Sequence, residues 1–180
     1  ESSRTVDVNI EVDRGRKVYV GEITVIGNTR TLDNVIRREF RLKEGELFDS
    51  VKLKRSKQRI NNLQFFEDVK IDTQRGENPD LIDILTTVTE KPTGTFTIGA
   101  GFSSVENVIF TTSIAQNNLF GNGHRVNVTA SLSSIRTDFN INLTEPRLFD
   151  STISAGFSAF NNVNDLLSFR MRTSGGGLRL

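Results

Sequence analysis

Cysteine is absent from this sequence of 180 residues, and histidine occurs only once. Without cysteine, the chain can form neither a disulfide framework nor a thiolate metal site. The single histidine, His124, directly follows the turn Gly121-Asn-Gly123, which favours a surface histidine over a metal ligand. We therefore predict no metal site and no cofactor.

Long hydrophobic runs are also missing. No apolar stretch in the second half approaches the roughly 18 residues that a membrane-spanning helix needs. The first residues, Glu1-Ser-Ser-Arg4, lack the basic and apolar regions of a secretion signal. For an exported protein, this absence predicts that the sequence is an internal piece of a longer precursor.

Charge becomes scarce after Pro92. Residues 1–92 carry 17 Lys+Arg and 17 Asp+Glu, whereas residues 93–180 carry 6 and 5. No lysine occurs after Lys91, yet 9 of the 13 phenylalanines do. A segment that is rich in Phe and Gly, poor in charge and free of helix-length apolar runs is typical of a transmembrane β-barrel. We predict a change of structure at Pro92.

The stretch 93–104 shows the pattern of the second half most simply. Every second residue of this stretch is apolar, namely Phe96, Ile98, Ala100 and Phe102. Alternation over about ten uncharged residues predicts a strand with one lipid-facing and one polar face. Five more alternating segments follow, near 109–115, 126–133, 138–144, 153–159 and 170–180. Because the smallest known membrane barrels have about eight strands, six strands predict a fragment.

Residues 16–91 have the mixed periodicity of a small α+β module, predicted as β-α-α-β-β. Strands are expected at 17–26, 69–74 and 81–89. Thr31 is predicted to cap a first helix, with its apolar face formed by Leu32, Val35, Ile36 and Phe40. A second helix is expected from Asp49 or Ser50 to Gln64, anchored by Val51, Leu53, Ile60 and Leu63. The alternation from Thr5 to Val12 predicts one more strand, belonging to a preceding module.

Motifs for enzyme chemistry or nucleic-acid binding are weak. Gly99-Ala-Gly101 lacks the third glycine and the helix of a dinucleotide site. Nothing near Glu67, Asp68 or Asp72 completes a metal or acid-base site. The basic run 52–59 has no interleaved aromatic residues, which favours a solvated helix face, with anionic lipid headgroups as a second interpretation. We predict neither an enzyme nor a nucleic-acid-binding protein.

Several segments, in this order, resemble the BamA family of outer-membrane β-barrel assembly factors. They are Val18-Tyr-Val20 to Gly27-Asn28, Arg37-Arg-Glu-Phe-Arg41, Glu44-Gly-Glu46, Phe65-Phe-Glu-Asp-Val69, Lys91-Pro-Thr-Gly-Thr-Phe96, Gln116 to Gly123 and Leu143 to Phe149. The resemblance implies an α+β POTRA domain at 16–91, followed by the first six antiparallel strands of a transmembrane β-barrel at 92–180. Residues 1–15 would be the last strand of a preceding POTRA domain.

The function implied by this resemblance is the folding and insertion of β-barrel proteins in the bacterial outer membrane, with the POTRA domain in the periplasm. The implied partners are unfolded outer-membrane proteins, lipoproteins of the assembly complex and the lipid bilayer. The family's lipoprotein contact maps to Glu39, with Arg37 and Arg38 beside it. An ordinary exposed helix glutamate is the alternative. A POTRA-barrel transporter that secretes a cognate exoprotein and a passive outer-membrane pore are the alternative functions.

Two predicted sheet edges are candidates for pairing with a client strand, because an open edge presents unpaired backbone groups. The first edge is Val69, Lys70, Ile71 and Asp72. The second is the first barrel strand: Thr95, Phe96, Thr97, Ile98, Gly99, Ala100, Gly101 and Phe102. Glycines 94, 99 and 101 make this strand easy to deform. The alternative is that they merely let strands pack or bend.

Overall fold

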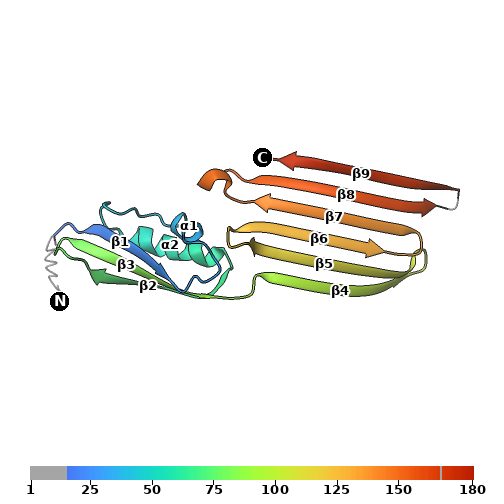
Figure 1. Ribbon diagram of the computed structural model, residues 1–180. Helices are drawn as coiled ribbons and strands as arrows, with labels where there is room; N and C mark the ends of the chain where they lie inside the picture. The colour runs from blue at the N-terminus through green and yellow to red at the C-terminus, as the bar shows by residue number, and fades with distance from the viewer. Residues whose placement is uncertain (1–15, 167) are drawn as a thin grey trace, which may run out of the picture.

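The computed structural model describes residues 16–166 and 168–180, which form two sheets lying end to end (Figure 1). One sheet has three strands in the order β1-β3-β2, and the other has six in the order β4-β5-β6-β7-β8-β9. The strand expected between Thr5 and Val12 lies outside the described residues. None of the helices in the described part of the chain has the length and apolar character to cross a membrane.

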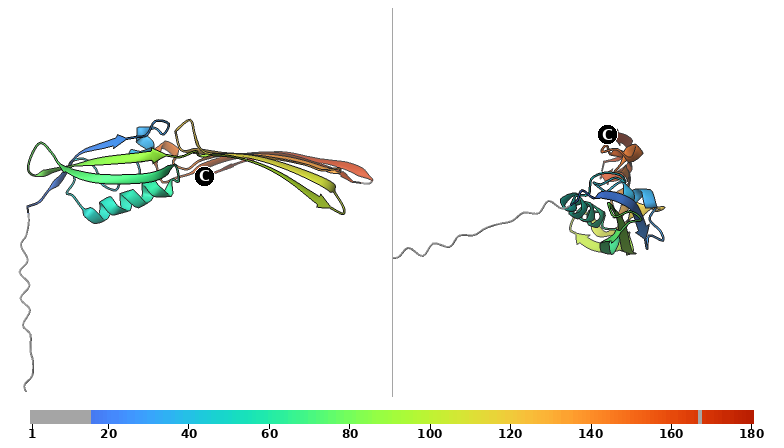
Figure 2. Two further views of the ribbon diagram at one scale, coloured as in Figure 1. Left: turned by 90° about the horizontal axis from the view of Figure 1, so that it is seen from below. Right: turned by 90° about the vertical axis from the view of Figure 1, so that its left-hand side faces the viewer.

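The three-stranded sheet is built from the predicted β-α-α-β-β order. Its elements are β1 (Tyr19–Ile26), α1 (Asp33–Arg37), α2 (Ser50–Asn62), β2 (Phe66–Arg75) and β3 (Leu81–Glu90). β3 pairs parallel with β1 and antiparallel with β2, so β3 is central and β2 is an edge strand. Figure 2 shows α2 lying along one face of this sheet.

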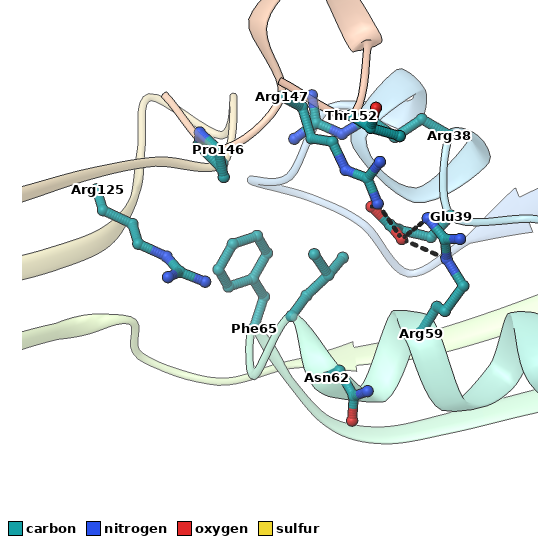
Figure 3. Close-up of a pocket in the computed structure, with 11 residues that line it drawn as sticks. Arg38, Glu39, Arg59, Asn62, Phe65, Arg125, Pro146, Arg147 and Thr152 are labelled. Carbon is teal, nitrogen blue, oxygen red and sulfur yellow. Dashed lines mark hydrogen bonds and ion pairs between the residues drawn. The ribbon is translucent and has the colours of Figure 1, made fainter. Parts of the chain in front are cut away.

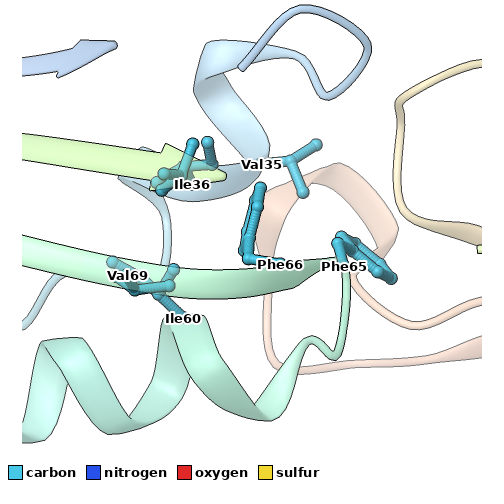
Figure 4. Close-up of a cluster of buried hydrophobic side chains, with 7 residues drawn as sticks. Val35, Ile36, Ile60, Phe65, Phe66 and Val69 are labelled. Carbon is cyan, nitrogen blue, oxygen red and sulfur yellow. The ribbon is translucent and has the colours of Figure 1, made fainter. Parts of the chain in front are cut away.

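Two clusters of buried side chains hold the helices on the sheet. The first, shown in Figure 4, joins α1 and α2 to β2 and β3 through Val35, Ile36, Ile60, Phe65, Phe66, Val69 and Val88. The second joins β1 and β3 through Val20, Ile23, Leu42 and Ile84. Burying each such side chain stabilises the fold by about 1.5–3 kcal/mol. The clusters lie entirely within residues 20–88, so this part of the chain has a core of its own.

The second helix begins as predicted but is anchored differently. The Asp49 side chain accepts hydrogen bonds from the backbone amides of Val51 and Lys52, at 2.7 and 3.1 Å, and so caps the helix. Ile60 is fully buried, whereas the predicted anchor Val51 is 56% exposed. Ser56, from the polar middle of the helix, is buried instead, because its Oγ accepts the Arg41 amide at 2.8 Å.

The first helix departs more from the prediction. α1 ends at Arg37, its N-cap position is Leu32, and no side chain caps it. Thr31 is therefore not the cap; its amide donates to Glu90 Oε1 at 2.7 Å. Val35 and Ile36 are buried as predicted, but Leu32 is 47% exposed and does not belong to the apolar face.

The second sheet contains the six predicted strands, each antiparallel to the next. They are β4 (Gly94–Ser103), β5 (Asn107–Leu119), β6 (His124–Leu132), β7 (Arg136–Glu145), β8 (Ala155–Leu166) and β9 (Phe169–Arg179). A short 3-10 helix, η1 (Leu148–Asp150), interrupts the β7–β8 connection. Ile153, predicted inside a strand, lies in this connection, where its carbonyl accepts the Leu148 amide at 2.9 Å.

The register of the six strands sorts their side chains into an apolar and a polar face. One cross-strand row is apolar: Phe96, Ile114, Val128, Ile141 and Ala159. The next row is polar except for one aromatic residue: Thr97, Ser113, Thr129, Asn140 and Phe160. On the apolar face of β4, Phe96 is 62% and Phe102 78% exposed. A continuous exposed apolar face of this kind is expected to meet lipid.

Candidate functional site

Strand β4 has one paired edge and one edge without a partner in the described chain. Every residue from Gly94 to Ser103 is paired with β5 in an unbroken register. On its other side, none of the strands at 16–166 and 168–180 pairs with it. The eight residues predicted for client pairing, 95–102, therefore lie together on one outer strand of the described sheet, whose other outer strand is β9; the backbone groups of an outer strand can pair with another strand.

The glycines of this edge are not required by the packing around them. A Cβ atom on Gly101 would have no heavy atom within 4 Å, and one on Gly99 would meet only the Thr111 carbonyl oxygen at 4.0 Å. Neither residue is among those with positive φ, so no left-handed backbone demands glycine. Within the described sheet, these glycines lower strand stability without a packing benefit.

The second predicted edge is also an open edge. Val69, Lys70, Ile71 and Asp72 lie in β2, which pairs on one side with β3 and on the other with no strand at 16–166 or 168–180. Val69 is buried and Ile71 half-buried in the core, while Lys70 and Asp72 point outward. The two predicted edges belong to different sheets, but β2 and β4 are the lowest strands of their sheets in Figure 1. They thus lie along the same side of the molecule.

The two sheets are joined by more than the linker 91–93. Asn118, which is 7% exposed in β5, donates to Thr31 Oγ1 at 2.9 Å and accepts the Gly123 amide at 2.8 Å. The Leu32 amide donates to the Gly121 carbonyl at 3.0 Å. The turn between β5 and β6 is thereby docked on the segment before α1. We call these contacts the junction.

Close approach at the junction explains one of its glycines. Gly121 has φ +76°, and a Cβ atom there would lie 2.0 Å from the Arg30 carbonyl oxygen. Both the conformation and the space therefore require glycine. The turn between β5 and β6 is thus a docking element for the preceding domain as well as a strand connection.

The sequence suggested that Glu39 could lie on an exposed helix face, but in the structure it is buried at the junction. It follows α1, and only 6% of its side chain is exposed. Its carboxylate binds Arg59 of α2 at 2.8 Å and Nη2 of Arg147, from the β7–β8 connection, at 3.1 Å (Figure 3). A buried carboxylate requires such partners, because its desolvation is otherwise uncompensated.

The two arginines next to Glu39 are also engaged within the chain. Arg38 pairs with Asp150 at 3.1 Å, and its side chain is 10% exposed. Arg37 is 41% exposed and pairs with Asp33 and Glu44. The hydrogen bond with Asp33 is the main reason that the pKa of Arg37 lies above its ordinary value. Of the three predicted partner-binding residues, Arg37 alone presents a substantial surface.

Sequence reasoning missed Arg147, Asn118 and Thr31 as junction residues. Arg147 lies inside the segment 143–149 that carried the family resemblance, but nothing in its local pattern points to Glu39. Across the described ranges, no group of three or more His, Asp or Glu side chains could hold a metal ion. His124 pairs with Glu145 instead.

Two families match separate parts of the chain. Residues 18–91 match POTRA, surface antigen variable number repeat, and residues 118–180 match the Omp85 superfamily domain. The outer membrane protein assembly factor BamA of Neisseria meningitidis serogroup B is 31% identical over 99% of this chain. The BamA of Neorickettsia risticii is 35% identical over 89% of this chain. The chain spans 23% and 22% of these two proteins, respectively.

Solved structures agree with this match. The crystal structure of BamA from Haemophilus ducreyi lacking POTRA domains 1–3 is similar over 92% of this chain and 32% of its own. The TM-score is 0.80 and the identity 28%. CdiB from Acinetobacter baumannii is 14% identical, with a TM-score of 0.58 over 90% of this chain and 32% of its own. The second likeness is one of fold alone.

Proposed function

Because this chain belongs to the Omp85 superfamily, with a POTRA domain before its Omp85 segment, we propose that it is part of an outer-membrane protein assembly factor. The POTRA domain lies in the periplasm, and β4–β9 form part of a barrel wall in the bacterial outer membrane. The clients are unfolded outer-membrane β-barrel proteins, which the protein folds and inserts into the bilayer.

The weakness of strand β4, which keeps glycines that its packing does not require, is the observation that carries this proposal. Backbone N–H and C=O groups on an unpaired edge supply affinity for an incoming strand whatever its side chains are. Gly99 and Gly101 weaken β4 although a Cβ atom would fit at either position. A wall strand that only closed a pore would gain stability from β-branched residues there. An edge that must open repeatedly benefits from being weak.

The edge of β2 gives the client an earlier binding place in the same proposal. Residues 69–72 lie on the same side of the molecule as β4 in Figure 1. A client strand added to β2 would thus approach the β4 edge from the periplasm. Lys70 and Asp72, which point outward, meet the client's side chains, while the backbone supplies the pairing.

A partner lipoprotein is proposed to bind the surface around Arg37. Arg38 and Glu39 are held by Asp150 and Arg147, so a partner that contacts Glu39 must first displace Arg147. Arg37→Glu should therefore reduce lipoprotein pull-down without opening the junction. Unchanged pull-down would remove this surface from the proposal.

The function is tested by replacing both glycines with threonine. Full-length protein carrying Gly99→Thr and Gly101→Thr is reconstituted in liposomes, and folding of an unfolded outer-membrane protein is followed by its gel mobility shift. Threonine favours a strand over glycine by up to about 1 kcal/mol at each site, so folding should slow roughly tenfold. Gly156→Thr is the control, because a Cβ atom there meets Arg179 Cβ at an ordinary 3.7 Å in a strand paired on both sides.

Each outcome has a clear meaning. Unchanged folding in the double variant would contradict the edge mechanism. Ion conductance by the wild type without any acceleration of client folding would favour a passive pore. Transport of a single cognate exoprotein, again without acceleration, would favour the transporter.

A further inference from the structure

A cavity of about 540 Å³ lies at the junction, between the POTRA domain and the start of β6. Its charged lining consists of one carboxylate and four guanidiniums: Glu39, Arg38, Arg59, Arg125 and Arg147. Asp150, which pairs with Arg38, adds a second carboxylate nearby. Even with both carboxylates ionised, the guanidiniums outnumber them, so the cavity is positively charged.

Several of these guanidinium donors have no acceptor in the part of the chain that the structure describes. The Arg125 side chain, which extends into the cavity from β6 (Figure 3), makes no hydrogen bond or ion pair with any residue at 16–166 or 168–180. Glu39 engages Arg147 only through Nη2, which leaves Nε and Nη1 without an acceptor in the described chain. The Nε atom of Arg38 is buried and finds no acceptor among the described residues, in a side chain that is only 10% exposed.

The remaining wall of the cavity carries both apolar and polar groups. Leu63, Phe65 and Pro146 contribute apolar surface, and Asn62 and Thr152 contribute polar groups. An apolar wall lowers the local dielectric and strengthens the attraction between a guanidinium and an anion. The planar guanidinium fork matches a carboxylate with two parallel hydrogen bonds. The cavity therefore suits a carboxylate that has apolar groups next to it.

The parity of β6 determines from which side a ligand reaches the cavity. Arg125 shares its parity with Asn127 and Thr129, on the polar face of the sheet. His124 of β6 pairs with Glu145 of β7 on the other face of the sheet. That face also carries the lipid-facing Val126 and Val128. Arg125 thus faces the polar side of the sheet, which favours a polypeptide over a membrane lipid as the ligand.

We propose that the junction cavity binds a carboxylate of the client polypeptide, from an acidic residue flanked by apolar side chains. Arg125 is the main partner, and Arg147 supplies a second donor. The proposal rests on the proposed function for the identity of the ligand. It adds a side-chain contact at the periplasmic end of the sheet to the backbone pairing at β4.

The test measures peptide binding to the full-length protein in neutral detergent micelles. Two fluorescent peptides are used, identical except that one carries a single Glu between apolar residues and the other Gln. The wild type should bind the Glu peptide about tenfold more tightly, as expected for a charge-assisted hydrogen-bonded pair. Arg125→Gln should abolish this difference. Arg172→Gln, which removes the same charge at the opposite end of the sheet, should retain it.

A reversed variant keeps the test decisive. Arg125→Glu should instead prefer a matched Lys peptide, which a merely misfolded protein would not do. Equal affinity of the wild type for both original peptides would overturn the proposal. The proposal would also be overturned if nanodiscs of anionic phospholipid displaced the Glu peptide and zwitterionic nanodiscs did not. The ligand would then be a lipid phosphate. The peptide assay does not depend on client folding. If the wild type accelerates client folding normally but does not prefer the Glu peptide, the cavity proposal is overturned and the proposed function is not.

Discussion

The carboxylate of Glu39 and the guanidinium of Arg147 lie 3.1 Å apart, although 108 residues separate them in the sequence. The pair ties the POTRA domain to the β7–β8 connection. Arg59 binds the same carboxylate from within the POTRA domain. Glu39 thus holds two cations together, with only 6% of its own side chain exposed.

Reversing this charge should destabilise the POTRA domain itself. Glu39→Lys places a third cation beside Arg59 and Arg147, so the free energy of unfolding of the POTRA domain within the full-length protein should fall by about 3–5 kcal/mol in urea denaturation. Glu67→Lys, at an exposed position in β2, is the control and should change it by less than about 0.5 kcal/mol. Equal effects of the two substitutions would mean that the burial of Glu39 contributes nothing to stability.

The junction should also fail when Gly121 gains a methyl group. Gly121→Ala forces a contact with the Arg30 carbonyl, whereas Gly45→Ala adds the same group at φ +83° with no atom within 4 Å. Spin labels on α2 and β6 of the full-length protein should show a broadened distance distribution for Gly121→Ala only. Similar broadening in both variants would assign the effect to backbone strain, not to the docking contact.

The stability of the loop before α1 should depend on acid pH through Glu90. Burial alone would raise the pKa of Glu90, but the hydrogen bonds from Thr31, Thr29 and Arg30 outweigh it, so the pKa lies below its ordinary value. A pKa depressed by folding gives stability above the unfolded pKa of about 4.3, and this stability is lost as pH falls. Below about pH 4, the stability advantage of the wild type over Glu90→Gln should shrink. An advantage that is constant with pH would contradict this assignment.

The two faces of β6 should respond differently to arginine. Val128 lies in the apolar cross-strand row and Asn127 on the polar face. Val128→Arg should destabilise the full-length barrel by roughly 2–4 kcal/mol if it lies near the membrane midplane. Asn127→Arg should be much milder. Equal losses of stability in urea unfolding from vesicles would contradict the assignment of faces.

The strands and their faces were predictable because the pleat imposes a period of two on neighbouring residues. Val128 and Asn127, for example, could be assigned to opposite faces from their neighbours alone. The start of the second helix near Asp49 was also predictable from local sequence, since the amides that donate to the Asp49 side chain lie two and three residues away. Local patterns also indicated the open edge of β2.

The junction was not predictable from local patterns. Thr31 looks like a helix cap and Glu39 like a surface helix residue, but their partners Asn118 and Arg147 lie 87 and 108 residues further along. Those contacts depend on how the two sheets meet, which no local period records. The polar residues Thr31 and Glu39 are buried because each is satisfied by a group from the other sheet.

The central claim, that a client strand pairs with the β4 edge, is tested most directly by disulfide trapping. A cysteine replaces Thr97 in the full-length protein, and single cysteines are placed along one strand of an unfolded client. During assembly with a mild oxidant added, a disulfide should form at the client position directly opposite Thr97. None should form at positions two residues to either side, which lie about 7–8 Å away, or when the cysteine replaces Thr129 in the interior strand β6. Equal trapping at Thr97 and Thr129, or none at Thr97 while the client still folds, would contradict this claim.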